Sequence, residues 1–182
     1  TARPGSPPDT FTIAQVTDNV EGVAGIAPGA GILPVRVLHY DDASGAVWGD
    51  TDDIANGILW AVDHGAHIIN MSLGSPSRSD AVADACAYAY EQDVMIVASS
   101  GNDGNPDGVL YPAALPTVFA VAAHGSTGEV TSYSNGGPEV DLIAAGGESS
   151  EDRDGDGHDD GIVQESVTEN GWRYVFTEGT SM

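Results

Sequence analysis

Apolar residues along the chain gather in short runs separated by segments of helical periodicity. The runs Ile32–Leu38, His67–Met71 and Val94–Ala98 are largely apolar throughout, which is typical of strands buried on both faces. Two further runs, Val118–Ala123 and Val140–Ala144, have the same character. The pattern therefore predicts a sheet of buried strands.

Two helices are expected between the first three runs, because apolar side chains recur there at helical spacing. Their predicted buried stripes are Ile54, Ile58, Ala61 and Val62 in the first helix, and Val82, Ala85, Cys86 and Ala89 in the second. Thr51 is the predicted N-cap of the first helix, and Ser79 or Asp80 opens the second. Alternation of strand and helix predicts parallel pairing with right-handed crossovers. The expected fold class is α/β, with a mainly parallel sheet sandwiched by helices.

Composition limits the classes of partner. The 182 residues correspond to one domain or part of one, and 28 Asp+Glu against 5 Lys+Arg give a formal net charge of −23. Such a charge repels nucleic acid and anionic membranes, so neither is an expected partner. A salt-rich habitat and an ordinary acidic secreted protein both fit this excess. No apolar run approaches the roughly 20 residues of a membrane helix, and no signal-peptide pattern opens the sequence.

Polar, glycine-containing turns follow several of these predicted strands. They are Asn70–Gly74, Ala98–Gly104 and, at the end of the chain, Glu178–Met182. Function in parallel sheets gathers at the carboxyl ends of the strands, and glycine lets a backbone approach a ligand closely. Each turn is a weak signal when taken alone.

Together and in this order, these turns and their neighbours resemble the subtilase family of serine endopeptidases. The resembling segments are Gly22–Leu38, Ile69–Gly74, Ser100–Gly104, Tyr111–Val118 (a loop that often holds a cis-proline in relatives), Ser132–Pro138 and Gly179–Met182. The resemblance implies a truncated, subtilisin-like three-layer α/β/α domain over residues 12–182, preceded by an irregular segment 1–11.

The resemblance also implies roles for particular residues. Ser181 would be the nucleophile that forms an acyl-enzyme, and the Asn102 amide would donate to the oxyanion together with the Ser181 backbone N–H. Opposite walls of the pocket for the residue before the cut would be formed by Ser72, Leu73 and Gly74 and by Ser99, Ser100 and Gly101. Small residues in these walls leave room for a large apolar side chain.

Two members of the catalytic triad are not recognised. The family's histidine motif would lie just before Thr12, where Gly5–Phe11 contains no histidine, and the aspartate motif would precede residue 1. The histidines at positions 39, 64, 67 and 124 lack the family's context and are expected to be surface or turn residues. This polypeptide alone is therefore expected to be poorly active or inactive.

An acidic insertion at about residues 147–172 contains a candidate calcium loop. Its spacing fits D-x-D-x-D-G, with Asp152, Asp154 and Asp156 as ligands, the His158 carbonyl as another, and Asp160 acting directly or through water. Val163 stands where a bidentate Glu is expected, and Glu165 is two residues late. A solvated acidic loop is the alternative. Asn19 resembles part of another calcium loop of the family.

The preferred hypothesis is a secreted, calcium-stabilised, monomeric subtilase acting on protein or peptide substrates. A non-catalytic relative that binds calcium or peptides as a scaffold is the main alternative. A third alternative, an unrelated α/β domain that binds a small anion, lacks any G-x-G-x-x-G or Walker-type signature. The single cysteine, Cys86, is expected to be a buried structural thiol.

Overall fold

The computed structural model describes residues 25–153, 155–168 and 171–182. The predicted N-terminal segment 1–11, Asn19 and Asp154 therefore lie outside the described residues. The described elements are β1 (His39–Tyr40), β2 (Val47–Trp48), α2 (Thr51–Asp63), β3 (Ile68–Met71), α3 (Asp80–Glu91), β4 (Met95–Ser99), β5 (Phe119–His124), β6 (Val140–Ala145), β7 (Ile162–Thr168) and β8 (Gly171–Thr177).

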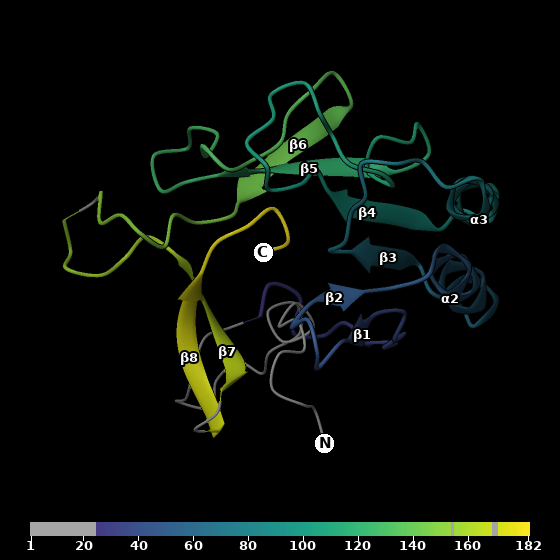
Figure 1. Ribbon diagram of the computed structural model, residues 1–182, viewed down its shortest axis with the longest axis horizontal. Helices are drawn as coiled ribbons and strands as arrows, with labels where there is room; N and C mark the ends of the chain where they lie inside the picture. The colour runs from purple at the N-terminus through teal and green to yellow at the C-terminus, as the bar shows by residue number, and fades with distance from the viewer. Residues whose placement is uncertain (1–24, 154, 169–170) are drawn as a thin grey trace.

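The main sheet has the order β3-β4-β5-β6, with every neighbouring pair parallel (Figure 1). Its register aligns Met71 with Ala98 and Ala98 with Ala120. Four of the five predicted strands are thus confirmed to within about a residue at each end. The parallel α/β class is confirmed as well.

Both described helices pack against one face of this sheet. Ile58 of α2 and Cys86 of α3 belong to the same buried cluster as Ile96 and Ala120. On the opposite face, Ile68, Met95 and Phe119 are 63%, 53% and 37% exposed. Within the described ranges, the sheet therefore has one covered and one open face.

Helix starts agree closely with the sequence pattern. Ser79 caps α3, and its hydroxyl accepts a hydrogen bond from the Val82 N–H at 3.4 Å. The predicted cap of α2 is wrong by one residue, because Asp50 holds the extended N-cap conformation and Thr51 is already helical. Asp52 and Asp53 lie in the first turn of α2, where the helix dipole favours negative charge.

The predicted strand Ile32–Leu38 is wrong. The structure assigns no strand over these residues, and only His39–Tyr40 pairs, antiparallel, with Val47–Trp48. The side chains of Val35 and Val37 instead approach the backbone of α2 at Gly57. Ile32, Leu33 and Val35 are nevertheless exposed, so the run is neither a paired strand nor a buried segment within the described structure.

The acidic insertion ends in a hairpin that the sequence analysis did not predict. Strands β7 and β8 pair antiparallel, with Val163 opposite Phe176 and Glu165 opposite Tyr174. Figure 1 shows this hairpin projecting away from the main sheet, after which the C-terminal segment curves back toward the tip of β3. The insertion therefore leads directly into the segment that carries Ser181.

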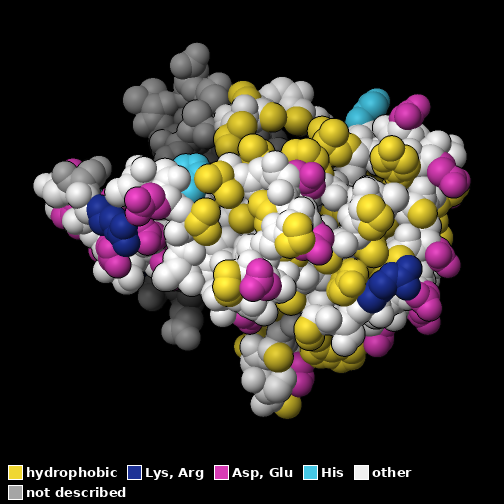
Figure 2. All heavy atoms as spheres, turned by 90° about the horizontal axis from the view of Figure 1, so that it is seen from above, with side chains coloured by type: hydrophobic (Ala, Val, Ile, Leu, Met, Phe, Trp, Pro, Cys, Tyr) yellow, Lys and Arg dark blue, Asp and Glu magenta, His cyan; other side chains and the backbone are white. Residues whose placement is uncertain are grey.

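Acidic side chains are spread over the face of the molecule shown in Figure 2, where basic side chains are sparse. This distribution accords with the net charge of −23. Within the described ranges, no helix has the length and apolar character needed to cross a membrane.

Candidate active site

The loop after β4 and the C-terminal turn meet at Asn102 and Thr180. The Oδ1 atom of Asn102 accepts hydrogen bonds from the Thr180 N–H and the Thr180 hydroxyl, each at 2.9 Å. The Thr180 hydroxyl oxygen also accepts the N–H of Gly101 at 3.3 Å. Two segments far apart in the sequence are thereby joined next to Ser181.

These bonds fix which way the Asn102 amide faces. A backbone N–H is only a donor, so the Asn102 side chain must present its oxygen to Thr180. Its NH₂ group is then directed elsewhere, and a Cβ on Gly179 would stand 3.5 Å from this nitrogen. Because Asn102 is exposed, a bound molecule can reach its two N–H donors.

The predicted wall after β3 also contacts the C-terminal turn. The Ser72 hydroxyl donates to the Ser181 carbonyl at 3.2 Å, and Asn70 donates to the Ser72 hydroxyl oxygen at 3.3 Å. The structure therefore brings together three sequence-predicted residues, Ser72, Asn102 and Ser181.

The second predicted wall, Ser99–Gly101, is bonded to the buried segment around Asn135. Ser100 is fully buried, and its hydroxyl donates to the Asn135 carbonyl at 2.8 Å. Ser99 is also buried, at 9% exposure. The Ser100 bond thus positions the backbone of this wall, and Gly101 at its end donates to the Thr180 hydroxyl oxygen.

An apolar cavity of about 510 Å³ opens beside the first wall. It is lined by Leu38, Val47, Trp48, Gly49, Thr51, Ile54, Ser72, Leu73, Gly74, Ser75, Ser77, Ser79, Val82, Tyr111, Pro112 and Leu115. The peptide bond between Tyr111 and Pro112 is cis, as the resemblance implies. The cavity places apolar surface next to the polar turns described above.

Asn135 is a site residue whose role the sequence does not predict. It is fully buried, and its Oδ1 accepts the N–H groups of Asp103 at 2.9 Å and Asn105 at 3.0 Å. Its Nδ2 donates to the Gly108 carbonyl at 2.9 Å. Asn135 therefore holds the loop that carries Asn102, and its position in a small, polar segment gave no signal of this.

Tyr133 holds the C-terminal turn in place through its hydroxyl group. Its hydroxyl accepts the Gly179 N–H at 3.2 Å and donates to the Gly147 carbonyl at 2.8 Å. Burial is the main cause that raises the pKa of Tyr133, with nearby Glu178 and Glu148 acting in the same direction. The hydroxyl therefore stays protonated and joins the start of the insertion to the turn before Ser181.

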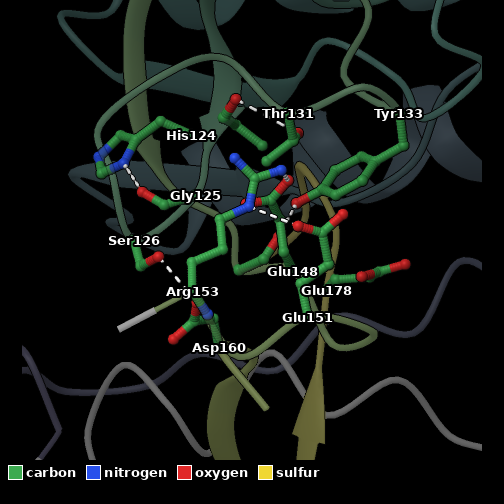
Figure 3. Close-up of polar contacts among 12 residues, drawn as sticks. His124, Gly125, Ser126, Thr131, Tyr133, Glu148, Glu151, Arg153, Asp160 and Glu178 are labelled. Carbon is green, nitrogen blue, oxygen red and sulfur yellow. Dashed lines mark hydrogen bonds and ion pairs between the residues drawn. The ribbon is translucent and has the colours of Figure 1, made fainter. Parts of the chain in front are cut away.

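Charged residues brace the insertion beneath this turn (Figure 3). Arg153 pairs with Glu148 at 3.1 Å and with Glu151 at 2.5 Å. Glu178, three residues before Ser181, accepts the Ser149 N–H at 2.6 Å. The start of the insertion is thus bonded to the turn that precedes the candidate nucleophile.

Four of the described histidines contact residues outside the candidate site, and the fifth, His67, is exposed. His39 lies 3.7 Å from Asp53, His64 stacks on Trp60 at 3.9 Å, and Nδ1 of His124 lies 2.8 Å from the Gly125 carbonyl. His158 stacks on Phe176 with 6.2 Å between ring centroids. These contacts agree with surface or turn roles.

The candidate calcium loop is folded around its first aspartate. The Asp152 carboxylate accepts the N–H groups of Gly155 at 2.7 Å and Gly157 at 3.0 Å, and Asp156 accepts the His158 N–H at 2.8 Å. Asp160, however, accepts the Arg153 N–H and the Ser126 hydroxyl. In the part of the chain that the structure describes, which omits Asp154, no three such side chains converge as a metal cluster.

Comparison with known proteins gives one consistent result. The model of the subtilase family matches residues 11–182. The thermostable alkaline protease of Halalkalibacterium halodurans is 38% identical over 171 residues, which cover 94% of this chain and 41% of that protein. The minor extracellular protease Epr of Bacillus subtilis is 44% identical over 128 residues, covering 70% of this chain and 19% of Epr.

The fold comparison agrees. A solved protease from Pseudoalteromonas arctica superposes with a TM-score of 0.80 at 34% identity, over 94% of this chain and 52% of that one. The chain therefore spans less than half the length of these two curated relatives.

Proposed function

Because the chain belongs to the subtilase family, we propose that the protein carrying it is a serine endopeptidase with Ser181 as its nucleophile. One observation carries this proposal. The Asn102–Thr180 hydrogen bonds hold an amide NH₂ group beside the turn that contains Ser181. A nucleophile and a donor for the developing oxyanion are the two groups that acyl transfer needs close together.

The proposed reaction begins with attack of the Ser181 hydroxyl oxygen on the scissile carbonyl carbon. The hydroxyl proton passes to a general base, and the carbonyl π electrons move to its oxygen, which accepts hydrogen bonds from Asn102 and from backbone N–H. Collapse of this intermediate expels the amine, protonated by the same base, and leaves an acyl-enzyme that water hydrolyses. His39, His64, His124 and His158 contact Asp53, Trp60, Gly125 and Phe176, none of which belongs to the candidate site. The proposal therefore assigns the general base to a residue outside the described part of the chain.

Peptide substrates are supported by the shape of the site. Ser72–Gly74 and Ser99–Gly101 provide two walls, and the cavity of about 510 Å³ beside the first wall offers apolar surface for a second substrate side chain. An extended peptide presents several side chains in succession, and these can occupy neighbouring pockets. A small-molecule substrate would need only one pocket. We expect that the protein cleaves its substrates outside the cell. We also expect that it is a monomer.

Hydrolysis of a quenched fluorescent peptide by the full-length protein tests the proposal. The wild-type protein should cleave the peptide, and Ser181→Ala should lose at least about 10³-fold in kcat. Ser126→Ala, which changes a serine bonded to Asp160, serves as the matched control and should retain activity. Equal activity of Ser181→Ala and wild type would exclude this nucleophile.

We also propose that the insertion binds calcium as a structural ion. Asp152, Asp154 and Asp156 would supply carboxylate oxygens, His158 its carbonyl, and Asp160 a direct or water-mediated contact. The bonds from Gly155 and Gly157 to Asp152 support a loop wrapped around its carboxylates. Bound calcium would brace the insertion and perform no chemical step.

Thermal unfolding with and without calcium tests this second proposal. Calcium at 100 times its Kd should stabilise the folded protein by about 2.7 kcal/mol, because the ion binds the folded loop selectively. Asp152→Asn should abolish the shift, whereas Asp141→Asn, on β6, should keep it. An unchanged melting temperature in saturating calcium would contradict calcium binding.

A further inference from the structure

The two faces of the β7–β8 hairpin differ in burial. Side chains alternate between the faces of a strand, so Trp172, Tyr174 and Phe176 of β8 share one of them. These aromatic side chains are 52%, 47% and 45% exposed. On the other face, Gln164 is 1% exposed and donates to the Thr177 hydroxyl at 2.8 Å. The aromatic side chains therefore lie on the open face of the hairpin.

Pairing across the hairpin adds residues of β7 to this open face. Val163 lies opposite Phe176 and Glu165 lies opposite Tyr174, and directly opposite residues share a face. The His158 ring, from the loop before β7, stacks on Phe176 with 14° between the ring planes. We call this surface the aromatic face, and it consists of Val163, Glu165, Trp172, Tyr174 and Phe176.

The charge of the aromatic face indicates what kind of partner it fits. Contiguous exposed apolar patches mark binding surfaces, and Trp and Tyr are enriched where proteins meet. Glu165 adds a carboxylate to the rings, whereas Arg173 belongs to the opposite face because it alternates with Trp172 and Tyr174. Within the described residues of the hairpin, the aromatic face therefore carries negative charge and no Arg or Lys.

A positively charged, extended segment fits this face best. A guanidinium or ammonium group is attracted to the faces of Trp and Tyr rings, and Glu165 places a carboxylate beside them. A second copy of the chain, with its net charge of −23, and an anionic membrane would both be repelled. The partner is also expected to be extended, because the seven residues of β8 form a surface about 24 Å long.

The aromatic face is close along the chain to the candidate nucleophile. Strand β8 ends at Thr177, four residues before Ser181, and Figure 1 shows one continuous segment that runs from β8 to the C-terminus. We infer that the aromatic face binds an extended segment of the protein substrate that contains Arg or Lys, away from the bond that is cut. This inference rests on the proposed endopeptidase function. The face would raise the affinity for whole proteins and take no part in the chemical step.

Fluorescence anisotropy of a labelled peptide of about ten alternating Arg and Ser residues tests the binding. Full-length Ser181→Ala protein should bind this peptide and should bind a Glu-Ser peptide of the same length at least about tenfold more weakly. Tyr174→Thr keeps every charge and should weaken binding of the Arg-Ser peptide about three- to tenfold, because one ring is lost. Tyr90→Thr, at an exposed tyrosine of α3, is the matched control and should leave the Kd unchanged.

A second pair of variants separates binding at the aromatic face from general attraction to an acidic protein. Glu165→Gln should weaken binding of the Arg-Ser peptide several-fold. Asp84→Asn removes one charge from an exposed position on α3 and should leave the Kd unchanged. Failure of the Arg-Ser peptide to bind, or equal weakening by Glu165→Gln and Asp84→Asn, would overturn the inference.

Kinetics with Ser181 intact provide a readout that depends on turnover. A short reporter peptide should have a lower KM when the Arg-Ser segment is attached to one of its two ends. Tyr174→Thr should raise KM for this long substrate alone and leave kcat for both substrates unchanged. An equal KM for the long and short substrates in the wild-type protein would contradict the inference. Binding of the Arg-Ser peptide without any hydrolysis would instead contradict the proposed endopeptidase function.

Other occupants of the aromatic face give different results in the same variants. Binding to phosphatidylcholine vesicles, or dimerisation in sedimentation, that is abolished by Tyr174→Thr would assign the face to a membrane or to a second copy. Either result, without binding of the Arg-Ser peptide, would overturn the inference.

Discussion

The side-chain oxygen of Asn102 accepts two hydrogen bonds from Thr180, each 2.9 Å long. This relationship determines both the position and the orientation of the Asn102 amide. Its oxygen is used for anchoring and its NH₂ group remains for a ligand. Anchoring and donation therefore belong to different atoms of one side chain, and substitutions can separate them.

Replacing Asn102 with Asp keeps the anchoring oxygen but removes the NH₂ donors. We expect kcat to fall by about 10² to 10³, because the oxyanion loses a donor, with only a small change in melting temperature. Asn102→Ala should lose the anchor as well and also be less stable. Asn105→Asp, in the same loop, should change kcat little. Equal activity of Asn102→Asp and wild type would contradict the oxyanion role.

The Tyr133 hydroxyl is predicted to position the turn before Ser181. Tyr133→Phe should lower the free energy of unfolding by about 1 kcal/mol and kcat several-fold, because Gly147 and Gly179 lose a shared partner. KM should stay unchanged, since the walls remain in place. Tyr88→Phe removes a hydroxyl bonded to Asp63 on the helices and serves as the control. A Tyr133→Phe protein with full kcat would exclude this positioning role.

Asn135 is expected to be the more important residue for stability. Its replacement by Ala leaves the Asp103 and Asn105 N–H groups and the Gly108 carbonyl without their partner. We expect a loss of about 3 kcal/mol in the free energy of unfolding, measured by urea denaturation. Asn105→Ala, at an exposed position, should cost less than about 1 kcal/mol. Equal decreases in the free energy of unfolding for Asn135→Ala and Asn105→Ala would contradict a stabilising role of the buried Asn135 amide.

Cys86 should be chemically inert in the folded protein. Burial raises the pKa of its thiol from 9.0 to about 11, so very little thiolate is present at pH 8. The thiol has a higher pKa in the folded than in the unfolded protein, so burial of the protonated thiol stabilises the fold below pH 9.0. This contribution to the free energy of unfolding is lost as the pH rises toward about 11. Iodoacetamide at pH 8 should therefore modify Cys86 in urea but not in buffer. Rapid labelling of the native protein would contradict the buried position.

Much of the fold could be predicted from the sequence because its strands are continuous apolar runs. The failure at Ile32–Leu38 shows the limit of this signal, because apolar residues gave no information on backbone pairing and Ile32, Leu33 and Val35 are exposed in the described structure. The β7–β8 hairpin was missed although Trp172, Tyr174 and Phe176 alternate along β8 with the period of a strand.

The candidate site was predictable only in part, for a related reason. Asn102 and Ser181 occur in motifs that can be compared with a family, and the structure places their loops together. Tyr133 and Asn135 act through contacts between distant segments, and no local pattern marks such contacts. These contacts join the loop after β5 to the loop after β4 and to the C-terminal turn, which are far apart in the sequence.

Site-specific labelling by a fluorophosphonate tests the central claim most directly. The full-length protein is treated with the reagent, digested, and mapped by mass spectrometry. A single adduct on the peptide containing Ser181, much slower to form in Asn102→Asp, is the predicted result. An adduct on another serine such as Ser72 or Ser99, or none in a protein that hydrolyses peptides, would contradict the account.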